Sequence, residues 1–173
     1  GFPGNRIYLS SGLLKSVEYE NELGAAISLE LGHILKRHAL SRIREEHLRN
    51  VEKNTDPADY PSVEGLVGSA PEDPRKSIDY FGPTGVFAFS DEAVIEASEA
   101  AVGILYRAGF DPRGLISFWA RFEKSPQHSP YPPELIQKLL EKTRRVIALY
   151  SPLRNPIVRS QAFLTIQKRM RKL

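Results

Sequence analysis

Two side chains in the stretch from residue 22 to residue 38 could do chemistry together. Glu30 and His33 are three residues apart, so on a helix the carboxylate and the imidazole lie on one face. A carboxylate can act as a general base, and a neutral imidazole is a common metal ligand. The alternative is a polar pair on a helix surface with no function. The rest of the chain must decide between the two.

The five residues from Leu29 to His33 read L-E-L-G-H. With a histidine at position 29 they would form H-E-x-x-H, in which two imidazoles four residues apart bind one Zn²⁺ and the glutamate is the general base beside the metal-bound water. Leu29 cannot coordinate a metal. Catalytic zinc usually has three protein ligands, so we expect the loss of one to lower zinc affinity by orders of magnitude.

A replacement ligand would have to be another histidine or a carboxylate, because the chain has no cysteine. His38 lies about 140° round a helix from His33, and His47 lies roughly 20 Å further along the axis. His128, in a proline-rich turn from 125 to 133, is the one substitute that could fold back to the site.

The composition restricts the classes of protein to which this chain can belong. A chain of 173 residues with 41% hydrophobic residues can form one domain with a sizeable core. The net charge of +3 is modest, and the basic C-terminal region carries no nucleic-acid-binding signature, so no nucleic-acid partner is predicted. No apolar run approaches the length of a transmembrane segment.

Hydrophobic periodicity predicts a mostly helical chain. A short β-rich run follows the first turn signal and predicts an edge strand at Arg6–Ser10. The region from 53 to 84 is rich in proline and predicts a long loop. The expected helices are Asn21–His38, capped by Asn21 and extending in polar form to about Val51, then Glu92–Ala108, Arg113–Lys124, Glu134–Tyr150 and Val158–Leu173.

Four blocks of the sequence resemble the minigluzincin zinc peptidases of the HtpX, OMA and CAAX-prenyl-protease group. The resemblance covers roughly residues 2–50 and 87–124. The family's later T-H-P block has its nearest counterpart at Ser129–Pro132, without the histidine in register. The four blocks are Phe2–Leu14, which resembles the edge strand and the entry to the active-site helix, Glu22–His38, which resembles that helix, Glu96-Ala97-Ser98, and Ala108-Gly109-Phe110-Asp111-Pro112.

The resemblance implies an α+β fold, mostly helical and zincin-like, with a small rim sheet. It implies one domain over residues 1–173, with the N-terminal part of the family domain missing and a divergent helical part at 125–173. Glu30 would be the catalytic base, and His33 and Glu96 would be zinc ligands, with Leu29 at the lost position. Ser98 stands where the family has an aspartate that orients a ligand. The substrate edge strand would be Arg6, Ile7, Tyr8, Leu9 and Ser10.

From these departures we expect a catalytically impaired peptidase-like domain that binds protein or peptide segments along its edge strand. Zinc, implied by the resemblance, is expected to be weak or absent, and a His33–Glu96 hydrogen bond is expected to replace it. Two alternatives stay open. One is an active zinc endopeptidase with an atypical ligand set in envelope protein quality control, and the other is a structural assembly domain. The resemblance to exported members suggests the cell envelope or periplasm.

Overall fold

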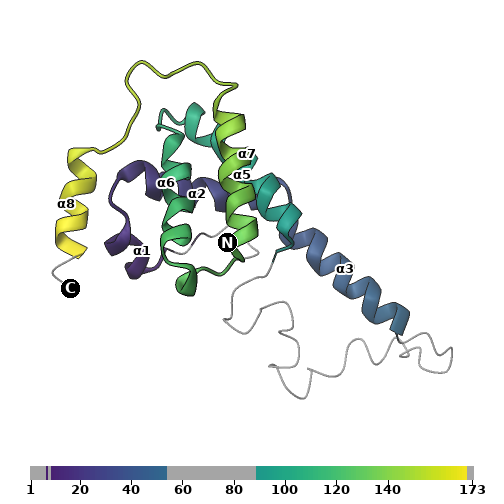
Figure 1. Cartoon of the computed structure of the whole chain (residues 1–173). Coiled ribbons are helices and arrows are strands. Elements are labelled where there is room, and N and C mark those ends of the chain that lie inside the picture. Colours follow the sequence, from purple (N-terminus) through teal and green to yellow (C-terminus); the bar gives the residue numbers. More distant parts are fainter. Residues whose placement is uncertain (1–6, 8, 54–88, 171–173) are drawn as a thin grey trace. The chain divides into compact units, whose positions relative to one another are not determined.

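The computed structural model describes residues 7, 9–53 and 89–170 (Figure 1). The chain divides into two compact units, which are Gly1–Lys36 with Ser90–Leu173, and Arg37–Phe89. The described part of the second unit contains helix α3 (His38–Lys53). The described elements of the first unit are α1 (Ser11–Ser16), α2 (Glu20–Leu35), α5 (Asp91–Arg107), α6 (Arg113–Lys124), the 3₁₀ turn η2 (Pro126–His128), α7 (Pro133–Ile147) and α8 (Gln161–Met170).

Helix α2 carries Glu30 and His33, and both of its ends differ from the prediction. Its N-cap is Tyr19, which makes no side-chain capping bond, whereas the predicted cap Asn21 lies inside the helix. The helix ends at Leu35 rather than His38, and Arg37 has a φ of 56°. A left-handed residue breaks the hydrogen-bond ladder of a helix, so the polar continuation is a separate helix, α3.

The two helices after residue 89 confirm the capping signals. The Ser90 hydroxyl accepts a hydrogen bond from the Ala93 amide at 3.3 Å and begins α5. Gly109 ends that region with a φ of 80°, a conformation that glycine adopts without steric cost. Helix α6 runs from Arg113 to Lys124 as predicted.

The core of the first unit lies where α2, α5, α6 and α7 pack together. Helix α2 contacts α5 and α6, and α7 contacts the same two helices (Figure 1). Burial of large apolar side chains is the main stabilising term in such a core. Its fully buried members include Val94, Val102, Leu105, Leu115, Trp119 and Leu139.

The buried residues of α2 include several small ones. Ala25, Ser28 and Gly32 are buried, whereas the larger Ile27 and Ile34 are only partly covered. A Cβ added to Gly32 would lie 2.5 Å from the carbonyl oxygen of Ala97 on α5. Small side chains therefore let α2 and α5 approach closely, which a stripe of large apolar residues would prevent.

The predicted rim sheet is not shown. Among the described residues there is no strand, and the one β-bridge is the isolated parallel pair Phe110–Ile157. Of the predicted edge strand, Arg6 and Tyr8 lie outside the described residues, and Ile7 and Leu9 are not in a strand. Ser10 is the N-cap of α1 and accepts a hydrogen bond from the Leu13 amide at 3.1 Å.

None of the described helices combines the length and the apolar character that crossing a bilayer requires. The predicted loop has its residues 54–84 outside the described part of the chain.

Candidate functional site

The residues of the L-E-L-G-H motif lie in the second half of α2. Leu29 is buried with 6% of its surface exposed, and His33 is buried with 5% exposed. Glu30 is partly buried. The close contact of Gly32 with Ala97 sets this turn of α2 against the turn of α5 that carries Glu96 and Ser98. The fold therefore brings together the two sequence blocks that the resemblance assigns to the site.

Glu96 lies at the solvent-facing side of this contact. Its side chain is 55% exposed, and its carboxylate is 3.8 Å from the ammonium group of Lys36, which is 49% exposed. An ion pair at this distance between exposed side chains contributes little to stability. The carboxylate assigned as a zinc ligand thus has a lysine beside it.

Ser98 is fully buried and belongs to a core hydrogen-bond network. Its hydroxyl accepts from the indole nitrogen of Trp119 at 3.1 Å and lies 3.2 Å from the hydroxyl of Thr143. A buried indole N–H needs such an acceptor, because an unpaired buried donor is costly. At the position where the family has a ligand-orienting aspartate, this chain has a serine bonded to α6 and α7.

Tyr131 is a further candidate that the sequence analysis did not select. Its ring packs edge-on against Trp119, with centroids 5.9 Å apart and planes at 69°. The Ser129 hydroxyl accepts from the Tyr131 amide at 3.1 Å and donates to the Tyr131 carbonyl at 2.7 Å, which fixes the turn. Burial, with a smaller contribution from the negative charge of Glu30, raises the pKa of Tyr131 to about 12.

Because the negative charge of Glu30 contributes to the raised pKa of Tyr131, the phenol and this carboxylate of α2 lie within electrostatic range of each other. At pH 7 the phenol is neutral and can donate a hydrogen bond to an acceptor. The available sequence signal was the position of Tyr131 within Ser129–Pro132, the nearest counterpart of the family's later block.

The start of α2 is held by a partly buried ion pair. The Glu22 carboxylate, 7% exposed, accepts from Arg121 of α6 at 3.0 Å and from the Glu18 amide at 2.9 Å. Arg121 also donates to the carbonyl of Ser16. These bonds connect α2, α6 and the end of α1.

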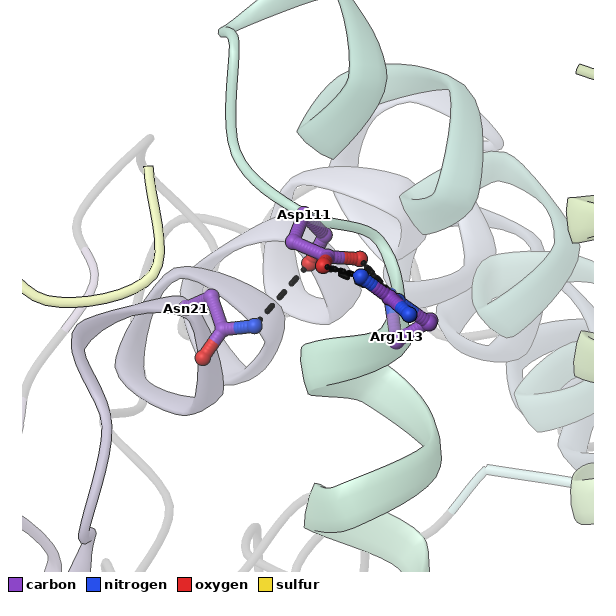
Figure 2. A network of polar contacts seen from close by, with 3 residues as sticks. All are labelled: Asn21, Asp111 and Arg113. Atoms are coloured by element: carbon purple, nitrogen blue, oxygen red, sulfur yellow. Dashed lines mark hydrogen bonds and ion pairs between the residues drawn. The ribbon is translucent and has the colours of Figure 1, made fainter. Parts of the chain in front are cut away.

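A second polar network connects α2 to the turn before α6 (Figure 2). The Asn21 amide nitrogen donates to the main-chain carbonyl of Asp111 at 3.2 Å. The Asp111 carboxylate accepts from Nε of Arg113 at 2.9 Å and 3.0 Å. The hydrogen bond from Arg113 holds the pKa of Asp111 below its usual value, against the opposing effect of burial. This turn therefore has a structural role, since its hydrogen bond to Asn21 holds the first turn of α2.

The described side chains do not fit a zinc site. Among them, no group of three or more histidine, aspartate or glutamate side chains is arranged to hold a metal ion. The substitute ligand considered at position 128 belongs to η2, but its side chain lies outside the described part of the chain. Leu29 has no donor atom that could coordinate a metal.

Comparison with known proteins confirms the resemblance. The model of peptidase family M48 matches residues 1–53, which include Glu30 and His33. By sequence, this chain is a relative of the M48 peptidases. The match does not extend to Glu96 on α5.

Curated relatives extend the similarity beyond that range. The beta-barrel assembly-enhancing protease of Escherichia coli O157:H7 is 26% identical over 141 residues, which are 78% of this chain and 28% of that protein. The protein of the same name from Yersinia pestis and a putative one from Vibrio cholerae are also 26% identical over 141 residues. The chain spans about 28% of the length of the curated relatives it matches.

Proposed function

We propose that this M48 relative is a catalytically impaired, peptidase-like domain that binds polypeptide segments. The observation that carries the proposal is Leu29, an apolar side chain 6% exposed at the position of the first zinc ligand. A site with two ligands instead of three binds zinc more weakly. The zinc-bound water, whose pKa the metal lowers, is the nucleophile of the family reaction, so it is lost together with the metal.

The neighbourhood of Leu29 supports the same proposal. Glu96 has Lys36 beside it, and the hydroxyl of Ser98 is bonded to Trp119 and Thr143. The His33–Glu96 hydrogen bond in place of a metal stays a prediction.

Glu30 and Tyr131 supply the polar groups with which such a domain would meet a polypeptide. A carboxylate accepts hydrogen bonds from peptide amides, and a neutral phenol can donate to a peptide carbonyl. Because the relatives are named for enhancing β-barrel assembly, we extend the proposal to polypeptides on that assembly route, in the cell envelope.

Zinc content tests the proposal first. Elemental analysis of the purified chain, before and after dialysis against zinc, should give far less than one equivalent. Binding of unfolded polypeptide, followed by anisotropy of a labelled casein fragment, should be the same with and without a chelator. Near-stoichiometric zinc together with chelator-sensitive cleavage of casein would instead establish the active endopeptidase with an atypical ligand set.

The polypeptide-binding part has its own test. Double replacement of Glu30 by Gln and Tyr131 by Phe removes the charge and the donor while keeping both shapes. We expect the affinity for the casein fragment to fall, whereas replacing the exposed Lys138 by Gln on α7 should leave it unchanged. Unchanged binding in the double variant would favour the assembly-domain alternative.

A further inference from the structure

A cavity of about 450 Å³ lies in the first unit, and neither the residues of the L-E-L-G-H motif nor Tyr131 line it. Its size falls within the range of small-ligand pockets, roughly 300–1,000 Å³. It is formed by the end of α5, the start of α6, the end of α7 and the segment that follows α7. The lining residues are Tyr106, Asp111, Pro112, Arg113, Ile147, Ala148, Tyr150, Ser151, Pro152, Leu153 and Pro156.

The wall of the cavity is mainly apolar and aromatic. The rings of Tyr106 and Tyr150 pack against each other with centroids 4.7 Å apart. Leu149 and Ile157, which adjoin lining residues, are 83% and 39% exposed. Apolar surface left open in this way gains free energy when a partner covers it, so the cavity favours an apolar group.

The charge at the edge of the cavity is positive. The positive charge of Arg113 is offset by Asp111 (Figure 2). Arg107 is exposed, and its Nε donates to the main-chain carbonyl of Gly103 at 3.2 Å. Within the described part of the chain no carboxylate pairs with Arg107.

Arg107 also lies beside the aromatic wall. A Cβ added to Gly103 would lie 2.9 Å from the hydroxyl of Tyr150 and 3.6 Å from Nη2 of Arg107. These two groups therefore lie close to the same point on α5. An apolar group placed against Tyr150 can therefore bring an attached anion to this guanidinium, which is suited to bind a carboxylate.

The segment from 151 to 155 supplies main-chain hydrogen-bonding groups. Within the described residues, its amides and carbonyls make no main-chain hydrogen bond, whereas Ile157 donates to the carbonyl of Gly109 at 2.8 Å. Exposed, unpaired main-chain groups beside an apolar pocket can pair with the backbone of an extended peptide. This favours a peptide over a simple anionic lipid.

We propose that this cavity is a second binding site, which takes the C-terminal residue of an extended polypeptide. Its apolar side chain enters the cavity beside the packed rings of Tyr106 and Tyr150, and its terminal carboxylate pairs with Arg107. The proposal goes beyond the function proposed above, because the cavity shares no lining residue with the Glu30 and Tyr131 site.

Fluorescence anisotropy with labelled octapeptides ending in phenylalanine tests it. We expect the free acid to bind about two- to fivefold tighter than the C-terminal amide, the effect of one partly exposed ion pair. Arg107→Gln should abolish this difference. Ala148→Phe, which fills the mouth from an exposed position, should weaken both peptides at least about tenfold, the result of losing more than 1.4 kcal/mol.

Arg145→Gln is the matched control, because Arg145 lies on α7 and pairs with Glu141 outside the lining. It should bind as the wild type does. Circular dichroism checks that each variant is folded. Equal affinity for the acid and the amide in the wild type, or unchanged binding by Ala148→Phe, would overturn the proposal. Displacement of the peptide by a lower concentration of dodecanoate would overturn it in favour of a lipid ligand.

Discussion

Metal binding depends on the residue at position 29. We expect Leu29→His to strengthen zinc binding by more than the ~10–100-fold that groups supporting a ligand contribute. The reason is that the new imidazole would lie one helical turn from His33 and supply the missing donor. Competition with a fluorescent zinc indicator measures the change.

Leu31→His provides the control on the same helix, because residue 31 is two positions from His33 and points to a different side. It should bind no more zinc than the wild type. Equal zinc affinity of the two variants would show that the gain comes from an extra histidine anywhere on α2 and not from the motif.

The raised pKa of Tyr131 predicts that the stability of the fold depends on pH under alkaline conditions. Its folded-state pKa of about 12 exceeds the value of about 10 in an unfolded chain. The stability it contributes is therefore present below pH 10 and is lost as the pH rises through 12. Glu30→Gln should lower the pKa of Tyr131, but not to 10, since burial is the larger cause.

Carbon NMR of ring-labelled tyrosine follows this titration, and Tyr131→Phe assigns the signal among the seven tyrosines. The same titration midpoint in Glu30→Gln and in the wild type would mean that the carboxylate does not act on the phenol.

The sequence offered Glu30, His33 and Glu96 as candidates, the first two through their helical spacing and Glu96 through the resemblance of its sequence block, and their roles stay predictions. Tyr131 could not be selected in the same way. Its relation to Glu30 depends on how the turn after η2 packs against Trp119 of α6, and no local pattern encodes an electrostatic interaction between residues a hundred positions apart.

At the scale of elements, the contact of α2 with α5 should tolerate no added side chain at Gly32. The new methyl of Gly32→Ala would stand 2.5 Å from the Ala97 carbonyl oxygen, so the helices must move apart. We expect a loss of about 1–3 kcal/mol in the free energy of unfolding. Urea denaturation measures it.

Gly12→Ala on α1 is the matched control. A Cβ there would meet only the Ser10 hydroxyl at 3.9 Å. Alanine has the higher helix propensity, so this variant should be about 0.5–1 kcal/mol more stable. A loss of stability as large as that of Gly32→Ala would contradict the steric explanation.

Helix positions were predicted well where local chemistry marks them. Ser90 and Gly109 bound α5, and Pro112 precedes α6, because caps and left-handed glycines act within one turn. The start of α2 was misplaced because Asn21 uses its side chain for Asp111, ninety residues away, rather than for the helix end. The break at Arg37 had no signal, since arginine rarely adopts a positive φ.

At the scale of the whole molecule, a single domain over residues 1–173 would unfold in one cooperative transition, which can be tested. The only tryptophan, Trp119, is in the core of the first unit and reports its unfolding by fluorescence. Far-UV circular dichroism reports all helices, including α3. If the chain is one cooperative domain, both signals should give the same urea midpoint. An earlier transition by dichroism alone would show that the second unit unfolds independently.

The network of Ser98, Trp119 and Thr143 limits which side chains position 98 can hold. The aspartate that the resemblance places there would put a charge where 0% of the surface is exposed, between an indole and a threonine that are already paired. Accommodating that charge would require α6 and α7 to be rebuilt around it. The residue type at one position of α5 is therefore coupled to the packing of two helices that lie elsewhere in the sequence.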